Sequence, residues 1–367
     1  MKFKKSDSHF FRFFKNNGQT AVSLEESYLL TRQLYVLQKA GVPLLSSLHA
    51  LQTQLPSGSL KRILRSVHQD LLEGRTFSQA LGRYPGMFGP VFLSLIRVGE
   101  AGGLLDEVLK QLTQLFEWEI ALRQQIKQAL QYPMIVLTTL SIAVTIMVVF
   151  VLPRFAQMFE SFHIPLPFQT RLLIGLSYVV SHYGWLLALL AAGAVFGWVS
   201  YIRTVAGRLR WHTWKLRLPL IGPILLQLAM SRVARITAAL NHTGVPILET
   251  IALAGESVNN TYIRARLELV RSKVRTGEPL ATAMRADPLF PPVVVQMVAT
   301  GEETGRMDEL LLSVSEYYDQ QIAYTLKRLL TFIEPILLVV VGLGVLLMAT
   351  AVFVPMWDLV KIFKQGR

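Results

Sequence analysis

The chain has 367 residues, of which 52% are hydrophobic and 17% are charged, and its formal net charge is +13. Soluble domains carry about 25% charged residues, so this composition indicates a protein with membrane-embedded segments. The sequence contains no cysteine, which excludes disulfides, thiolate nucleophiles and cysteine metal sites.

Residues 1–23 form a basic, aromatic N-terminal arm. Five Lys and Arg residues alternate there with five phenylalanines. This composition suits binding to an anionic membrane surface, to which each basic residue contributes about 1 kcal/mol of binding free energy. A solvated, disordered arm fits the composition about as well. Nucleic acid binding is a weaker alternative, because no DNA- or RNA-binding motif accompanies the charge.

Residues 24–131 have a helical pattern. Ser23 and Glu26 form a capping box ahead of an amphipathic helix. Gly41 is expected to make the left-handed turn that ends this helix, and Pro43 to begin the next one. Further Gly and Pro breaks divide the stretch into about six helices, of which the last runs towards an apolar segment.

Three stretches of 19 residues contain no Asp, Glu, Lys or Arg, namely 134–152, 184–202 and 336–354. A helix of this length covers about 28 Å, close to the thickness of the hydrocarbon core of a membrane. A buried core helix usually has a shorter apolar run, so each stretch is predicted to span the membrane.

The chain also contains a long internal repeat. Residues that recur 203 positions later, or 202 after a one-residue slip, are Arg32, Gly41, Val42, Pro43, Gly74, Gly99, Glu100, Gly103, Asp106, Glu107, Pro133 and Pro153. The register holds for more than 100 residues, which predicts two versions of one six-helix domain, called repeat 1 and repeat 2 below. Each repeat leads into its own span in the same direction, and the middle span returns the chain between them.

Basic residues near the spans predict the orientation in the membrane. Nine Lys and Arg residues flank the spans on the side of the repeats, against two in the loop 153–183, so both repeats are expected in the cytoplasm. Three basic residues after position 360 disagree with this orientation, because it places the C-terminal tail on the periplasmic side. The predicted all-α organisation is arm 1–23, cytoplasmic repeat 24–131, transmembrane helix 134–152, periplasmic loop 153–183, transmembrane helix 184–202, cytoplasmic repeat 203–333, transmembrane helix 336–354 and tail 355–367.

Common motifs of enzymes and transporters are missing from the sequence. It has no GxxxxGK[ST] phosphate-binding loop and no HExxH zinc motif, and its seven histidines are isolated from one another. The three predicted spans carry no Asp, Glu, Lys, Arg or His, which argues against a membrane protease or a proton-coupled transporter. No catalytic, cofactor-binding or metal-binding residue is therefore assigned.

The most distinctive motif is GExxGxxDE, present once in each repeat at residues 99–107 and 301–309. Its glycines can form a tight turn between helices, and its consecutive acidic residues then begin the next helix, where the dipole favours carboxylates. An acidic corner that binds a partner protein is compatible with this turn, and a divalent-cation or catalytic site is a weaker alternative. The candidate partner-binding residues are Gly99, Glu100, Gly103, Asp106, Glu107, Gly301, Glu302, Gly305, Asp308 and Glu309.

Together these features resemble the F/PilC family of inner-membrane platform proteins from type II secretion and type IV pilus machines. The resemblance covers nearly all of residues 24–360 and rests on the duplicated domain, the Gly-Val-Pro turn, the GExxG turn before Leu-Asp-Glu or Met-Asp-Glu, and Tyr-Pro or Glu-Pro ahead of a span. It implies a scaffold without enzymatic activity or cofactors, whose cytoplasmic domains contact a hexameric assembly ATPase while its spans receive pilin or pseudopilin subunits. Other inner-membrane assembly proteins and a second copy of the chain are further implied partners, and the basic arm adds membrane lipid.

Two rival functions remain at this level. A small-molecule transporter subunit would need a polar cavity within the membrane, and the spans offer little to line one. A membrane enzyme such as a prepilin peptidase would depend on membrane-associated aspartates, and no predicted span contains Asp. The leading hypothesis is a platform that couples the ATPase to insertion or removal of filament subunits.

Overall fold

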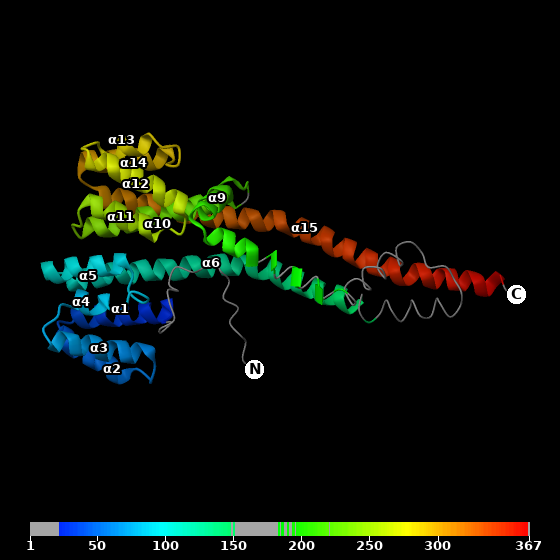
Figure 1. Ribbon diagram of the computed structural model, residues 1–367, viewed down its shortest axis with the longest axis horizontal. Coiled ribbons are helices and arrows are strands. Elements are labelled where there is room, and N and C mark those ends of the chain that lie inside the picture. The colour runs from blue at the N-terminus through cyan, green and yellow to red at the C-terminus, as the bar shows by residue number, and fades with distance from the viewer. Residues whose placement is uncertain are drawn as a thin grey trace. The chain divides into compact units, whose positions relative to one another are not determined.

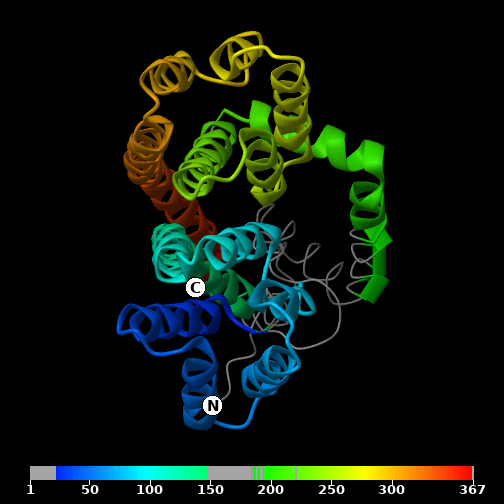
Figure 2. The same ribbon diagram turned by 90° about the vertical axis from the view of Figure 1, so that its left-hand side faces the viewer.

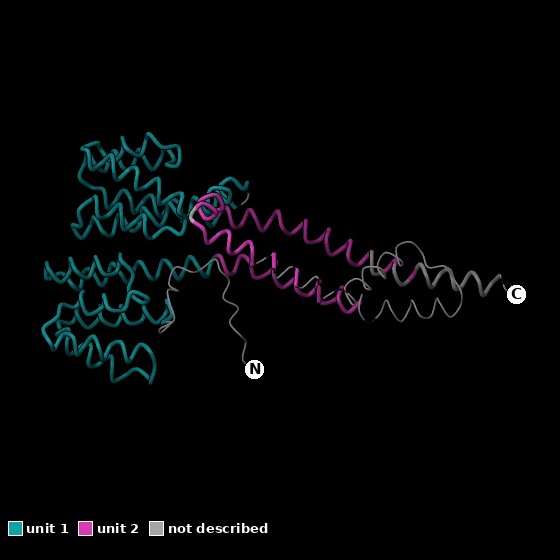
Figure 3. Tube along the Cα trace, in the orientation of Figure 1, with its two compact units in different colours: residues 1–125, 212–323 teal, residues 126–211, 324–367 magenta. Residues whose placement is uncertain are grey.

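The computed structural model describes residues 22–147, 150, 183, 185–186, 189–190, 193–194, 196–219 and 221–365 (Figure 1). The arm through residue 21, the loop 151–182 and much of the expected middle span lie outside these residues. Every regular element in the described part of the chain is a helix, as the sequence pattern predicts. The chain divides into two units, residues 1–125 with 212–323 and residues 126–211 with 324–367 (Figure 3).

Repeat 1 consists of six helices, α1 (Leu24–Lys39), α2 (Leu44–Gln54), α3 (Ser59–Leu72), α4 (Phe77–Gly82), α5 (Pro90–Gly102) and α6 (Leu105–Ile146). Ser23 and Glu26 form the predicted capping box, since each side chain accepts the backbone N–H of the other residue, at 3.0 and 2.6 Å. Gly41 turns the chain with a φ of +77°, and Pro43 directly precedes α2. The local signals therefore place the helix ends as expected.

Repeat 2 has the same order of helices, α10 (Gly222–His242), α11 (Ile247–Ser257), α12 (Thr261–Arg275), α13 (Leu280–Arg285), α14 (Pro292–Thr304) and α15 (Met307–Gln365), and α9 (Val205–Arg217) precedes them. Among the described residues, the glycines with positive φ form three pairs across the repeats, Gly41 with Gly244, Gly74 with Gly277, and Gly103 with Gly305. L-residues with a side chain rarely adopt this backbone conformation, which explains the glycine at each turn. The two repeats therefore share the backbone conformation of these turns, as the predicted duplication requires.

The two repeats pack against each other within one unit. The apolar core of repeat 1 includes fully buried Leu48, Leu64 and Phe77, and it continues into Ile236 and Leu240 of α10. Repeat 2 has a second core of its own, to which α10 and α11 also contribute. In Figure 2 the cyan helices α5 and α6 accordingly lie between the blue α1 and the green α10 and α11.

Three described helices are long and apolar enough to cross a membrane, namely α6, α10 and the Met307–Leu346 part of α15. In the apolar stretches of α6 and α15, 6% of the residues are buried within the protein, whereas 56% are buried in α10. A spanning helix presents apolar side chains to lipid, so α6 and α15 fit this role and the cores explain the apolar residues of α10. Of the expected middle span 184–202, residues 196–202 are described continuously and are helical.

Helices α6 and α15 each run without a break from a repeat into an expected span. α6 continues through Pro133, and the hydroxyls of Thr138 and Ser141 donate to the carbonyl four residues earlier, at 2.7 Å. These bonds satisfy polar groups that could find no water inside a bilayer. α15 continues to Gln365, past the expected end of the span at residue 354. The helices of the repeats and the membrane-spanning stretches are therefore single elements.

Candidate partner-binding site and repeat interface

The four motif glycines build the turn between the fifth and sixth helix of each repeat. Gly103 and Gly305 end α5 and α14 with φ values of +68° and +70°. At Gly99 the next helix is so near that a Cβ would lie 2.8 Å from Val108 Cγ2, and at Gly301 a Cβ would lie 2.9 Å from the backbone of α15. Only glycine fits these contacts without movement of a neighbour, so the motif glycines form the interhelical turn that their spacing predicts.

Glu100 and Glu302 point towards a neighbouring helix of their own repeat. The Glu100 carboxylate accepts the N–H of Phe77 at 2.5 Å and both the N–H and the hydroxyl of Ser78, at 3.1 and 2.8 Å. Glu302 accepts the first two N–H groups of α13, at 2.6 and 2.8 Å. The first N–H groups of a helix have no partner within it, so these glutamates cap α4 and α13. Their candidate role in partner binding stays a prediction.

The consecutive acidic residues of the motif begin α6 and α15. Asp106 and Glu107 lie in the first turn of α6, and Asp308 and Glu309 in the first turn of α15. The structure brings two of them together around His242, whose Nε2 lies 3.2 Å from Glu107 Oε1 and whose Nδ1 lies 2.8 Å from Asp308 Oδ2. Asp106 and Glu309 are exposed and take no part in this contact. The motifs of the two repeats are thus connected through a histidine.

The two carboxylates raise the pKa of His242 above its ordinary value of 6.5. The hydrogen bond with Asp308 has the largest effect, desolvation opposes it, and Glu107 adds to it. The same hydrogen bond lowers the pKa of Asp308. An imidazolium donates from both ring nitrogens, so protonated His242 can satisfy both carboxylates at once and link the repeats.

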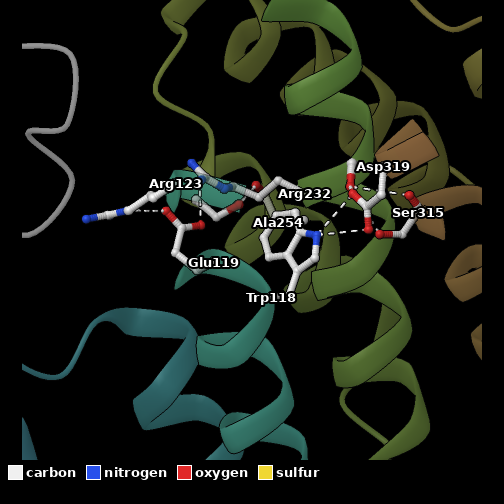
Figure 4. Close-up of polar contacts among 9 residues, drawn as sticks. Trp118, Glu119, Arg123, Arg232, Ala254, Ser315 and Asp319 are labelled. Atoms are coloured by element: carbon white, nitrogen blue, oxygen red, sulfur yellow. Dashed lines mark hydrogen bonds and ion pairs between the residues drawn. The ribbon is translucent and has the colours of Figure 1, made fainter. Parts of the chain in front are cut away.

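A second polar cluster joins α6 of repeat 1 to α10 and α15 of repeat 2 (Figure 4). Trp118 donates its indole N–H to both carboxylate oxygens of Asp319, each at 3.0 Å. Asp319 also accepts hydrogen bonds from Ser231 Oγ at 2.6 Å and from Arg235 Nη2 at 2.8 Å. The guanidinium groups of Arg235 and Arg232 lie 5.2 and 5.8 Å from the centre of the Trp118 ring, within cation–π range. One aromatic side chain therefore connects several groups of repeat 2.

Next to this tryptophan, Glu119 pairs with Arg232 of repeat 2 at 2.5 Å and with Arg123 at 2.9 Å (Figure 4). Burial alone would raise the pKa of Glu119, but the two guanidinium groups outweigh it and hold that pKa below its ordinary value. Ser94 on α5 adds a hydrogen bond to Glu249 on α11, at 3.2 Å. These contacts place α5 and α6 of repeat 1 against α10 and α11 of repeat 2.

Sequence reasoning missed both Trp118 and His242. Their counterparts in the other repeat are Gln320 and Lys39, so a search for recurring residues passes over them. The carboxylate partners of His242 lie 66 and 135 positions away in the chain, which leaves the histidine isolated in the sequence. Divergence between the repeats gave no signal for these two residues, because the repeats differ at most of their positions.

Comparison with known proteins matches one family to each repeat. The sequence model of "Type II secretion system (T2SS), protein F" matches residues 30–153 and again residues 233–355. The two matches begin 203 residues apart and end 202 residues apart, which are the offsets of the internal repeat. Each match covers most of one repeat together with the expected span that follows it.

Individual relatives resemble the whole chain. Type II secretion system protein F of Aeromonas hydrophila is 33% identical over 97% of this chain and 90% of its own length. The type IV pilus assembly protein PilC of Myxococcus xanthus is 30% identical over 89% of this chain and 78% of its own length. The type 4 fimbrial assembly protein PilC of Pseudomonas putida is 33% identical over 90% of this chain and 82% of its own length. The expected resemblance is therefore confirmed, and the chain belongs to the family of type II secretion system protein F.

Proposed function

We propose that this chain is the inner-membrane platform of a type II secretion or type IV pilus machine. In this role it couples a hexameric cytoplasmic assembly ATPase to the insertion or extraction of pilin or pseudopilin subunits, without catalysing a reaction itself. Family membership supports a membrane component of such machinery. The further proposed partners are other inner-membrane assembly proteins, membrane lipid and a second copy of the chain.

The continuity of α6 and α15 is the observation that carries the coupling role. Each helix begins in a packed repeat and continues into an apolar stretch with the length and composition of a membrane span. Each chain segment stays helical through the proline at the entrance of its span, Pro133 in α6 and Pro335 in α15, so a displacement of the repeat reaches the span. A flexible linker at this point would absorb such a displacement.

A deletion strain tests the function as a whole. Loss of the gene should abolish filament assembly or secretion while pilin or pseudopilin synthesis continues. Normal filaments and normal secretion in that strain would overturn the proposal.

An insertion in α6 tests the coupling more sharply. Four alanines after Gln131 lengthen α6 by about one helical turn, whereas four glycines at the same point make a soft joint. The alanine variant should retain more secretion or pilus assembly than the glycine variant, at equal amounts of protein in the membrane. Equal activity of the two variants would contradict transmission through a stiff helix.

Docking of the ATPase is proposed at the acidic residues that begin α6 and α15. Asp106 is the best position for a test, because it is exposed, whereas Glu100 caps α4 and its substitution would disturb the fold as well. Asp106→Lys should weaken capture of the ATPase by the full-length protein. Glu25→Lys is the matched control, since Glu25 is an exposed acidic residue in the first turn of α1. Unchanged capture with Asp106→Lys would leave this corner a purely structural turn.

Both repeats are proposed to face the cytoplasm, with the end of α15 in the periplasm. The basic residues beside the expected spans support this orientation. Alkaline phosphatase fused after Arg367 should be active, because this enzyme matures only outside the cytoplasm. Fluorescence from a green fluorescent protein fused at the same point would place this end in the cytoplasm and contradict the proposed orientation.

A further inference from the structure

The two repeats contact each other through different faces. Repeat 1 uses α5 and α6, and repeat 2 uses α10, α11 and, through Asp319, one side of α15. By their place in the repeat, α10 and α11 correspond to α1 and α2, and α5 and α6 correspond to α14 and α15. The contact is therefore head to tail, and it leaves two faces outside it. One is the α1–α2 face, and the other is the exposed side of α14 and α15 that carries Gln296, Glu309 and Gln320, called the α14–α15 face. Figure 2 shows α1 on the side of α5 and α6 that is turned away from α10.

One stripe along α10 makes most of the polar contacts with repeat 1. Its residues share one side of the helix because of their spacing, and they are Arg232, Arg235, Ala239 and His242. Both arginines lie over the Trp118 ring, Arg232 also pairs with Glu119, and His242 bonds to Glu107. This stripe is therefore the part of α10 that binds repeat 1.

The corresponding stripe on α1 is open to solvent. Its residues, 203 positions earlier, are Leu29, Arg32, Val36 and Lys39, and all four are exposed. Val36 is 56% exposed, whereas Ala239 at the matching position is 6% exposed. Two exposed aliphatic side chains alternate with two cations along this stripe, and the aliphatic side chains would gain from burial in a contact of the same kind.

The polar pairs of the internal contact can also be formed between the two open faces. His242 with Glu107 becomes Lys39 with Glu309, a cation with an anion, and both are exposed. In the same way Glu249 with Ser94 becomes Ser46 with Gln296, and Asp319 with Trp118 becomes Glu117 with Gln320. All three pairs combine a hydrogen-bond donor with an acceptor.

The groups already present around these side chains do not prevent such a contact. Lys39 lies 5.7 Å from the ring centre of Tyr35, and Glu309 pairs with Arg306 one turn earlier on the chain. Exposed pairs of this kind contribute about 0–1 kcal/mol, so they can be exchanged for an intermolecular pair. Some internal contacts have no equivalent. Leu29 stands where Arg232 pairs with Glu119, and Gln320 stands where the Trp118 ring lies below two guanidinium groups. The apolar side chain of Leu29 adds contact area in place of the ion pair.

We propose that the α1–α2 face of one molecule binds the α14–α15 face of a second copy of this chain, with Lys39 against Glu309. This inference deepens the self-association that is part of the proposed function. The occupant follows from the internal contact, because the same two kinds of face already bind each other within one molecule. The geometry is heterologous, so each added molecule presents a new open face and the contact builds a ring or a row.

Chemical cross-linking of introduced cysteines tests this contact directly, since the natural chain has no cysteine. Molecules with Lys39→Cys and molecules with Glu309→Cys carry different affinity tags and are produced together, without other components of the machine. A bismaleimide, which joins two thiols across a gap the length of a Lys–Glu pair, should give a mixed product at twice the mass of the chain when it is added to the isolated membranes. Direct oxidation is unsuitable here, because a disulfide needs Cβ atoms within about 3.5–4.5 Å. Addition of Val36→Asp to the first variant should abolish this product, since an exposed aspartate leaves the fold intact but opposes burial.

Control variants test whether the cross-link is specific to the proposed contact. Leu72→Cys in place of Lys39→Cys should give no mixed product, because Leu72 is exposed at the end of α3. A bismaleimide cross-link between two molecules that both carry Lys39→Cys would reveal a two-fold contact and overturn the proposal. Absence of the mixed product, or cross-linking of Lys39→Cys to a different protein in the complete machine, would also overturn it. The deletion strain tests the proposed function separately from these outcomes.

Discussion

The indole N–H of Trp118 lies 3.0 Å from both carboxylate oxygens of Asp319, so a single side chain joins the two helices that lead towards the expected spans. Trp118 belongs to α6 and Asp319 to α15. Asp319 also accepts hydrogen bonds from Ser231 and Arg235 of its own repeat. A displacement of one repeat against the other must therefore break or carry along this pair.

Trp118→Phe should lower the thermal stability of the purified full-length protein. Phenylalanine keeps the aromatic ring but removes the donor to a charged acceptor, and such a bond contributes about 1.5–3 kcal/mol. The loss of unfolding free energy should be near the lower end of this range, because Asp319 keeps two other hydrogen-bond partners. Trp118→Ala should cost more, since it also removes the ring below two guanidinium groups. Thermal unfolding in detergent measures both effects.

A double-mutant cycle assigns this effect to the pair. Trp118→Phe and Asp319→Asn are combined, and the change in the double variant should be smaller than the sum of the single changes. Strict additivity would show that Trp118 and Asp319 do not interact in solution.

Stability should depend on pH through His242. Its pKa is raised in the folded protein, so its contribution is fully present below its ordinary value of 6.5 and is lost as the pH rises through the raised value. The pKa of Asp308 is lowered, so the contribution of this carboxylate is present above its ordinary value of 3.8 and is lost only in more acidic solution. Between about pH 6 and pH 8.5, wild-type protein should lose more stability than His242→Gln does.

Thermal unfolding across this pH range provides the measurement for His242. His49→Gln is the control, because His49 is an exposed histidine on α2. Equal pH dependence of the wild type and His242→Gln would contradict a protonated bridge between Glu107 and Asp308.

The elements of each repeat could be predicted because their ends depend on local chemistry. The Ser23–Glu26 capping box and the left-handed turn at Gly41 act within a few residues, and both are present as expected. The recurrence at Gly244, with a φ of +80°, adds independent support from the second repeat. The described parts of the spans were predictable for the same reason, since length and apolarity of a helix are local properties.

The interface between the repeats could not be predicted in this way. Trp118 and Asp319 are 201 positions apart, and their contact depends on how two finished domains pack. The motif glutamates were similarly ambiguous, because a carboxylate that caps a neighbouring helix looks the same in sequence as one that binds a partner. Glu100 meets Phe77 only once α4 and α5 have packed together.

Removal of the Glu302 carboxylate should destabilise repeat 2. Glu302→Ala leaves the first two N–H groups of α13 without their acceptor, and hydrogen bonds to a charged group contribute about 1.5–3 kcal/mol each. The net loss should be about 1–3 kcal/mol, because water can reach part of this exposed site. Glu303→Ala removes an exposed carboxylate next to it on α14 and should change stability little. Equal thermal midpoints of the two variants would contradict the capping role.

Gly99→Ala should destabilise repeat 1 by overpacking. The added methyl group would lie 2.8 Å from Val108 Cγ2 and 3.3 Å from the Leu104 carbonyl oxygen, and strain of this kind costs about 1–3 kcal/mol. Gly102→Ala is the matched control on the same helix, because its Cβ would meet no atom closer than 3.8 Å. Alanine is also the better helix former, so this control should be neutral or slightly stabilising.

Val108→Ala can show that the close approach of α5 and α6 is the cause. Val108 is buried, so this substitution alone should also lower the free energy of unfolding. In combination with Gly99→Ala it removes the atom that the new methyl group would strike, and the double variant should lose less stability than the sum of the single changes. Denaturant unfolding of the four proteins measures this coupling. If the two losses simply add, Gly99 is required for a reason other than its contact with Val108.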